Sequence, residues 1–480
     1  MKESEIARAH AQLSARQLAE GAHGAAFESI ATALRLAPGL APLWAQFSDV
    51  IRYFNLRHPV PPPVRELLAK ALEHPAVDPG NLVRPITTLA LSQPNPLDEP
   101  LLLRLMEDVV IRDASLERLI ADTRRRMLDE ALPLPVMNAI AQQCINTEYV
   151  FEESEEERAR VAAITSTDPV SLARVAAYGP ASDKAPGTAS AGSSVSSKVQ
   201  AQYEENPYPR WVRTQSVFPP ATLADVVKDL FPSLRVQIPK QPRILVAGCG
   251  TGQNAIATAR RFAGAQVLAV DISRASLAYA QGKTRELGIG NIEYRQADIL
   301  ALGGLAERFD LIESSGVLHH LEDPFEGWRV LTSLRKPGGL MRIGLYSEAG
   351  RRPVARAREL IAAEGFTADA AGIRACRAAI RARADDPLLA AIARNEDFYS
   401  MSGCRDLLFH VHEVCFSLPQ IEAMIARLGL RFLGFEFPDS GQTLSRYRAR
   451  FADPADLQSW HRFEAEHPDT FARMYQFWVT

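Results

Sequence analysis

A glycine-rich turn, Ala247-Gly-Cys-Gly-Thr-Gly252, has the residue spacing of a ligand-binding loop. It follows the apolar run Arg243-Ile-Leu-Val-Ala247 and precedes a segment with helical periodicity. Glycine lets the backbone approach a ligand closely, and the first N–H groups of a helix carry a partial positive charge. We therefore expect this turn to bind a cofactor through four residues: Gly248, Cys249, Gly250 and Gly252.

Two carboxylates follow the next two apolar runs. Asp271 comes 21 residues after Gly250, where its oxygens can accept hydrogen bonds from both hydroxyls of a ribose. Asp298 can accept a hydrogen bond from the exocyclic amine of adenine. Their apolar neighbours Ile272 and Ile299 are assigned to the same site, and we expect Ile299 to pack on the adenine ring.

Two further motifs complete the pattern. Residues 309–324 contain an apolar run followed by Leu-His-His-Leu-Glu-Asp-Pro, and residues 334–341 contain a Pro-Gly-Gly turn before another run. Together with the glycine turn and the carboxylates, they resemble the class I S-adenosylmethionine-dependent methyltransferases over about residues 200–348. Gln253 replaces the third glycine of the dinucleotide fingerprint, which argues against a nicotinamide enzyme. Ala247 departs from the family, which often has an acidic residue at this position.

The resemblance implies S-adenosyl-L-methionine as the cofactor, with Ser314 among the residues that bind it. It also implies methyl transfer to an oxygen, nitrogen or carbon of an acceptor, which is a small molecule or a protein or peptide. Such an enzyme aligns the acceptor and excludes water, and it needs a base only where the acceptor atom carries a proton. The alternative is a protein that binds the cofactor and recruits a partner without turnover.

Three residues are candidates for a catalytic role. His319 and His320 follow the fourth apolar run, at the edge of the expected sheet where ligands bind. Either could act as a base, and a purely structural role in the pocket wall is the favoured alternative. Tyr203 is the third candidate, because its ring could attract the cofactor's sulfonium by a cation–π interaction.

The peptide Gln202-Tyr-Glu-Glu-Asn-Pro-Tyr-Pro-Arg-Trp211 contains three large aromatic side chains, which a plain linker would not need. Its two prolines predict an extended backbone. In related methyltransferases this segment often folds over the cofactor, and the resemblance implies the same here. Tyr208 and Arg210 are therefore assigned to cofactor binding, although plain packing of the peptide is the alternative.

The segment 399–413 ends in His410-Val-His-Glu413, which could suggest a metal ligand set. No further ligand cluster accompanies it, so we expect no metal and favour a polar network of Arg405, Asp406 and His410 facing the substrate. Arg351 and Arg352 begin an arginine-rich segment. They could pair with an acidic acceptor, but a solvated helix is the favoured interpretation.

These residues need a scaffold that brings the ends of several strands together. From residue 243 onward, short apolar runs alternate with helical segments, which predicts a doubly wound, mainly parallel α/β sheet. Strands are expected at 243–247, 266–270, 291–295, 309–314 and 340–346, and two edge strands at 430–437 and 474–479. We therefore assign residues 201–480 to a methyltransferase domain with a helical insertion at about 350–398.

Residues 1–170 show helical periodicity throughout and predict an all-α domain. His10 and Trp44 lie one 34-residue period apart, and the residues between them resemble a tetratricopeptide repeat, although only one copy is legible. An irregular helical domain is the alternative. Residues 171–200, rich in Ser, Ala and Gly, predict a flexible linker.

Composition limits the partners and the compartment. The 480 residues carry 54 basic and 57 acidic side chains, a net charge of −3, which makes nucleic acid an improbable partner. No run is long and apolar enough for a membrane helix, and five scattered cysteines fit a reducing cytoplasm. A protein or peptide partner could bind the N-terminal helices.

Overall fold

The structure is a computed structural model that describes residues 3–179, 194–213, 220–437 and 441–480. Its residues pack as two compact units. The helical unit comprises residues 3–179, 210–213 and 357–409, and the sheet unit comprises 194–209, 220–356, 410–437 and 441–480. Of the expected linker at 171–200, residues 180–193 lie outside the described residues, and residues 171–178 and 195–200 belong to helices, so the prediction of a linker is wrong for them. Within the described part of the chain, none of the helices combines the length and apolarity needed to cross a membrane.

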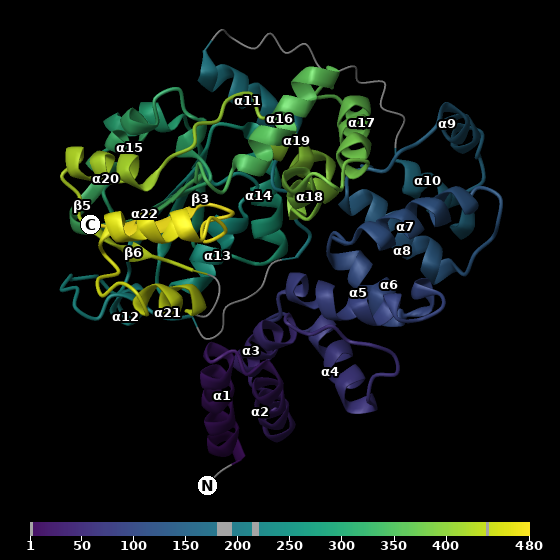
Figure 1. Ribbon diagram of the computed structural model, residues 1–480, viewed down its shortest axis with the longest axis horizontal. Coiled ribbons are helices and arrows are strands. Elements are labelled where there is room, and N and C mark those ends of the chain that lie inside the picture. The colour runs from purple at the N-terminus through teal and green to yellow at the C-terminus, as the bar shows by residue number, and fades with distance from the viewer. Residues whose placement is uncertain (1–2, 180–193, 214–219, 438–440) are drawn as a thin grey trace. The chain divides into compact units, whose positions relative to one another are not determined.

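The helical unit begins with a series of helices joined by short turns (Figure 1). These are α1 (Glu3–Ala19), α2 (His23–Leu36), α3 (Ala41–Ile51), α4 (Pro62–Glu73), α5 (Val83–Leu91), α6 (Pro100–Asp108), α7 (Ala114–Arg126), α8 (Leu134–Asn146), α9 (Glu155–Ala162) and α10 (Pro169–Tyr178). It also contains most of α16 (Arg352–Glu364), and α17 (Ala370–Arg381), α18 (Pro387–Ala393) and α19 (Met401–Phe409).

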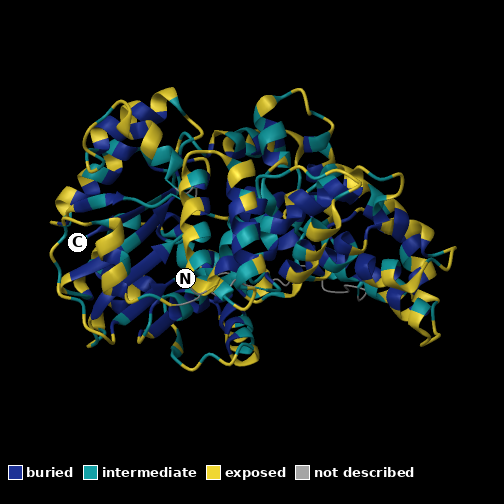
Figure 2. Ribbon diagram, turned by 90° about the horizontal axis from the view of Figure 1, so that it is seen from below, coloured by how far each residue is buried: buried dark blue, intermediate teal, exposed yellow. Residues whose placement is uncertain are grey.

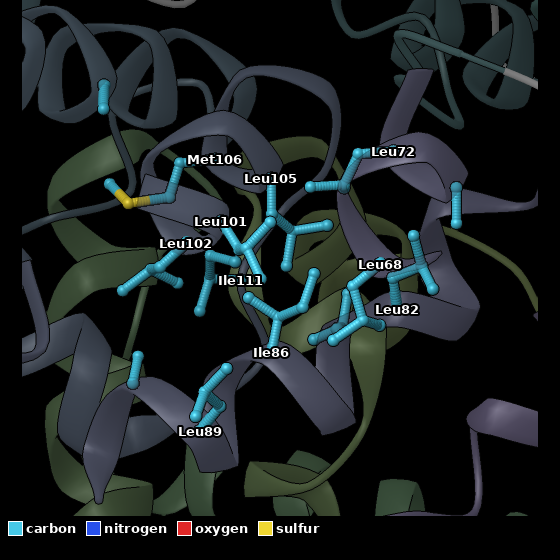
Figure 3. Packing of buried hydrophobic residues seen from close by; sticks show 14 of the residues in the cluster. Leu68, Leu72, Leu82, Ile86, Leu89, Leu101, Leu102, Leu105, Met106 and Ile111 are labelled. Atoms are coloured by element: carbon cyan, nitrogen blue, oxygen red, sulfur yellow. The ribbon is translucent and has the colours of Figure 1, made fainter. Parts of the chain in front are cut away.

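One continuous apolar core holds helices α1–α10 of the helical unit together. Figure 3 shows leucine and isoleucine side chains of α4, α5 and α6 gathered in this core, among them Leu68, Leu72, Ile86, Leu89, Leu101 and Leu105. The helices are short, so their stability comes mainly from burying these faces together.

Buried ion pairs attach the arginine-rich segment to the N-terminal helices. Arg377 of α17 is almost fully buried, and its guanidinium contacts both carboxylate oxygens of Glu117 at 2.9 and 3.0 Å. Arg381 pairs with the same carboxylate. The expectation of a solvated helix is therefore wrong for Arg377, because an arginine is buried where a carboxylate compensates its charge.

The sheet unit contains seven strands in the order β3-β2-β1-β4-β5-β7-β6. The strands are β1 (Arg243–Ala247), β2 (Gln266–Asp271), β3 (Ile292–Gln296), β4 (Phe309–Ser315), β5 (Arg335–Leu345), β6 (Phe432–Phe435) and β7 (Tyr475–Val479). The first five are parallel, and β7 runs antiparallel to both β5 and β6. The predicted doubly wound, mainly parallel sheet and the all-α region are thus confirmed.

Helices cover both faces of the sheet. Alternate β1 residues enter different cores: Leu245 and Ala247 enter one, and Ile244 and Val246 enter the other. The first core includes α15 (Pro324–Ser333), α20 (Leu418–Arg427), α21 (Gln442–Arg448) and α22 (Leu457–Glu466). The second includes α12 (Leu223–Leu230), α13 (Gln253–Arg261) and α14 (Arg274–Glu286). Because both faces are covered, the strands are largely buried (Figure 2).

One expectation about the sheet is wrong. The last strand, β7, lies between β5 and β6 and is not an edge strand. Its Phe477 and Trp478 are fully buried on the two faces of the sheet, which suits an interior position. The short strand β6 forms the edge instead.

Candidate functional site

The glycine turn links β1 to α13 and is folded tightly. The N–H groups of Gly248 and Cys249 both donate to the carbonyl of Val270 in β2, at 2.8 and 2.9 Å. Gly248, Gly250 and Gly252 all have positive φ, which L-residues rarely adopt. A Cβ on Gly250 would lie 2.7 Å from the carbonyl oxygen of Tyr208, so glycine is required there by a close backbone approach.

The carboxylate of Asp271 connects this turn to the start of α14. One oxygen accepts the Gly250 N–H at 2.8 Å, and the other accepts the Ser273 N–H at 2.9 Å. Burial raises the pKa of Asp271, while the two N–H donors act in the opposite direction. The carboxylate therefore fixes both loops at the carboxyl ends of β1 and β2.

Residues 203–209, which we call the strap, contact both of these loops. The strap begins in the last turn of α11 (Val195–Glu205), and the Ser273 hydroxyl donates to the carbonyl of Tyr203 at 3.0 Å. The Glu204 carboxylate accepts the first two N–H groups of α14, at 2.8 and 2.9 Å. The Thr251 hydroxyl donates to the carbonyl of Pro209. These hydrogen bonds hold the peptide, with Tyr203 and Tyr208, against both loops, and its folding over the cofactor stays a prediction.

The carboxyl end of β4 carries Ser314, and the turn after it carries the two histidines. His319 is fully buried and stacks on Tyr346, with ring centroids 3.8 Å apart. Burial, together with the nearby His320, His410 and Arg351, lowers the pKa of His319 well below its usual value. His319 is therefore neutral at pH 7.

The residues of the segment after α19 that suggested a metal ligand set, His410, His412 and Glu413, each have a partner within the chain. His410 contacts the Tyr203 hydroxyl at 3.2 Å, and His412 contacts the carbonyl of Leu321 at 3.1 Å. The carboxylate of Glu413 binds the guanidinium of Arg351. The three side chains thus have three different partners.

Arg351 is buried and paired within the chain, so the favoured interpretation of a solvated helix is wrong for this residue. Its guanidinium contacts both oxygens of Glu413, at 2.9 and 2.5 Å, and lies 3.9 Å from the ring centre of Tyr346. Only 8% of Arg351 is exposed. Its planar donors are already occupied by a carboxylate within the chain.

The remaining predicted residues occupy separate positions. Asp298 caps the short 3-10 helix η3 (Ile299–Gly304) by accepting the Leu300 N–H at 2.9 Å, and Ile299 is buried in the core of the sheet unit. The Ile272 carbonyl accepts from the Gln296 side chain at 3.1 Å. Arg210 is exposed and belongs to the helical unit, as do Arg405 and Asp406. Their assigned roles stay predictions.

This region of the chain matches the family model described as "Methyltransferase domain", over residues 244–339. The match runs from β1 through the glycine turn, Asp271 and both histidines into β5. Residues 244–339 are thus a methyltransferase domain.

Two relatives are similar to this domain and its surroundings. An uncharacterized protein of Synechococcus is 32% identical over 238 residues, which cover 46% of this chain and 56% of that protein. A ubiquinone biosynthesis O-methyltransferase of Pseudomonas fluorescens is 33% identical over 156 residues, which cover 32% of this chain and 64% of the enzyme. The chain therefore spans less than two thirds of either relative.

Among solved structures, PKMT2 from Rickettsia typhi is similar over 55% of this chain and 54% of that chain. The TM-score is 0.42 and the sequence identity 18%.

Several buried polar atoms of the methyltransferase domain are suited to a ligand. They are the Ser314 hydroxyl, both ring nitrogens of His319 and the side-chain nitrogen of Asn206, and within the described residues none has a hydrogen-bond partner. Buried polar atoms are rarely left unpaired in proteins. Together with the carboxylates of Asp271 and Asp298, this set of donors and acceptors fits S-adenosylmethionine, which offers hydroxyl, amino and carboxylate groups.

Sequence reasoning missed the contacts that hold the site together. Glu204, Thr251 and Ser273 had no assigned role, yet they bind the strap and its neighbouring loops. The signal for Ser273 was present, because serine before a helical segment is typical of a helix N-cap. Glu204 gave no such signal, since it caps a helix 70 residues further along the chain.

We predict that Gly250→Ala destabilises the sheet unit by about 1–3 kcal/mol. Alanine disfavours the positive φ of this position, and its Cβ would clash with the Tyr208 carbonyl oxygen. Gly282→Ala in α14 is the matched control. Its Cβ meets nothing within 4 Å, so alanine should stabilise the helix by about 0.5–1 kcal/mol. Denaturant unfolding measures both, and equal effects of the two variants would contradict the packing described for Gly250.

We also predict an acid-sensitive contribution from His319. Its pKa is lowered on folding, so the unfolded chain binds more protons below about pH 6.5 and the folded state loses stability as the pH falls. The loss amounts to at most about 1.4 kcal/mol for each pH unit. Thermal unfolding between pH 7 and pH 5 should show a smaller loss for His319→Gln than for the wild type, and parallel curves would refute the prediction.

Proposed function

We propose that this protein transfers a methyl group from S-adenosyl-L-methionine to an acceptor atom. The observation that carries the proposal is the Asp271 carboxylate, which holds the glycine turn and the start of α14 together directly beside the strap. The match to the methyltransferase domain supports the same chemistry. Among oxygen, nitrogen and carbon, we favour an oxygen acceptor, because O-methyltransferases are among the relatives.

Residues at the carboxyl edge of the sheet would hold the cofactor. We assign the ribose to Asp271, the adenine to Asp298 and Ile299, and the remaining contacts to the glycine turn, Ile272 and Ser314. Tyr203, Tyr208 and Arg210 complete the proposed set. When bound, the cofactor supplies an electrophilic methyl group, and the chain's task is to orient the acceptor and exclude water.

His319 is the proposed proton acceptor for a hydroxyl acceptor. It is neutral, it is buried, and neither of its ring nitrogens is paired within the described residues. His320 is less suited to this role, because its Nδ1 already contacts the carbonyl of His412 at 2.8 Å. We assign His320 to the wall of the site.

For the helical unit we propose a tetratricopeptide-like role, in which its helices bind a protein or peptide partner. Helices α1 and α2 pack closely against each other, and Trp44 is buried at the expected repeat distance. We place the protein in the cytoplasm, because all five cysteines are free thiols. The domain limits at about residues 170, 200 and 350–398 remain part of the proposal.

The proposal predicts that the protein transfers label from tritiated S-adenosylmethionine to a component of a cell extract. Separation of the extract into protein, nucleic acid and small molecules identifies the labelled fraction. Asp271→Asn should weaken cofactor binding in calorimetry about tenfold to a hundredfold, since it removes a charged hydrogen-bond acceptor. Asp225→Asn, at the distant start of α12, is the control and should bind normally. Binding without label transfer would favour the partner-recruiting alternative, and no binding at all would refute the proposal.

A further inference from the structure

His410 lies where the segment after α19 meets α11 and the strap. The segment is attached to α11 by the N–H of Val411, which donates to the Gln202 side chain at 3.1 Å. Beside this contact, His410 Nε2 lies 3.2 Å from the hydroxyl oxygen of Tyr203. His410 is buried and Tyr203 is half-buried, so this hydrogen bond is partly shielded from water.

The backbone fixes which nitrogen of His410 carries the proton. The N–H of His412 donates to His410 Nδ1 at 3.1 Å, so Nδ1 must be the unprotonated acceptor. A neutral imidazole with a free lone pair on Nδ1 carries its hydrogen on Nε2. His410 therefore donates from Nε2 to the Tyr203 oxygen.

The ring of His410 is also held from the other side. It stacks on His320, with ring centroids 3.7 Å apart and planes 22° apart. His320 in turn donates from Nδ1 to the carbonyl of His412 at 2.8 Å, because a carbonyl can only accept. His410 thus connects Tyr203 of the strap to the histidine turn that follows β4.

We propose that His410 is a positioning residue for the strap: its Nε2–H holds the Tyr203 phenol beside the histidine turn and so keeps the strap closed on the cofactor loops. The other end of Tyr203 supports this role, since its carbonyl accepts from Ser273, next to the Asp271 loop. Tyr203 is thus held at its carbonyl and at its hydroxyl, and it spans from the carboxyl end of β2 to the turn after β4. The inference rests on the proposed function, because the strap matters to turnover only if the cofactor binds beneath it.

Two amide substitutions separate the two nitrogens of His410. Gln places its amide nitrogen near the position of Nε2 and can still donate to Tyr203, whereas Asn reaches only the position of Nδ1. Both variants lose the ring stack on His320. They differ in the donor to Tyr203 and in the acceptor for the His412 N–H, so the comparison is repeated without the Tyr203 hydroxyl to isolate the first contact. We expect His410→Asn to raise the KM for S-adenosylmethionine at least about fivefold relative to His410→Gln.

Tyr203→Phe provides the second half of a double-mutant cycle. Without the phenol oxygen, the difference in KM between the Asn and Gln variants at position 410 should fall below about twofold, because the hydrogen bond to Tyr203 is gone from both. A fivefold difference that persists in the Tyr203→Phe background would overturn the proposal. So would equal KM values for the two variants in the wild-type background.

A second measurement needs no cofactor. Lys198 is exposed on α11, one helical turn from Gln202, and trypsin cleavage after it reports how often α11 opens. In the cofactor-free protein, cleavage should be faster for His410→Asn than for His410→Gln. Equal rates would overturn the proposal that His410 positions the strap. If the wild type binds no S-adenosylmethionine, the proposed function fails, and the cleavage rates still decide whether His410 holds the strap.

Discussion

The carboxylate of Asp271 accepts one backbone hydrogen bond from the glycine turn and one from the start of α14, and the rest of the site depends on this arrangement. A buried carboxylate is unfavourable unless donors surround it, and the two N–H groups provide that compensation. As a result, the loops after β1 and β2 cannot move independently. The strap is attached to the same loops through Thr251, Ser273 and the start of α14. Turn, carboxylate and strap therefore form one hydrogen-bonded assembly at the carboxyl edge of the sheet.

The side chains near the turn after β4 are either neutral or paired with an opposite charge. Arg351 and Glu413 neutralise each other, and the lowered pKa of His319 keeps it uncharged at pH 7. The ring of His319 stacks on Tyr346, and the ring of His410 stacks on His320.

Local sequence signals were sufficient for the sheet and insufficient for the contacts between distant segments. The run Arg243-Ile-Leu-Val-Ala247 predicted β1 with its exact limits, since five apolar or extended-forming residues stand directly before a glycine turn. The position of Asp271 at the end of β2 was also predicted from spacing. Its bonds to Gly250 and Ser273 were not, because a hydrogen bond across two loops leaves no periodic trace in the sequence. The place of β7 inside the sheet was also missed, because strand order is decided by packing on both faces.

Charged residues were the hardest to interpret. Arg351 lies 62 residues from Glu413, and Arg377 lies 260 residues from Glu117, so composition alone suggested a solvated face or a substrate contact. Both arginines are instead buried against carboxylates, which only the tertiary structure brings together. Their net stabilisation depends on the balance between desolvation and pairing.

Hydrogen exchange with and without S-adenosylhomocysteine tests the central claim most directly, namely that strap and loops form one cofactor-binding assembly. Binding should slow exchange together in the strap, in the glycine turn and at the start of α14, because ordering one part orders the others. The amino-terminal edge of the sheet should be unaffected and serves as the internal control. Protection of the glycine turn with unchanged exchange in residues 203–209 would contradict the account.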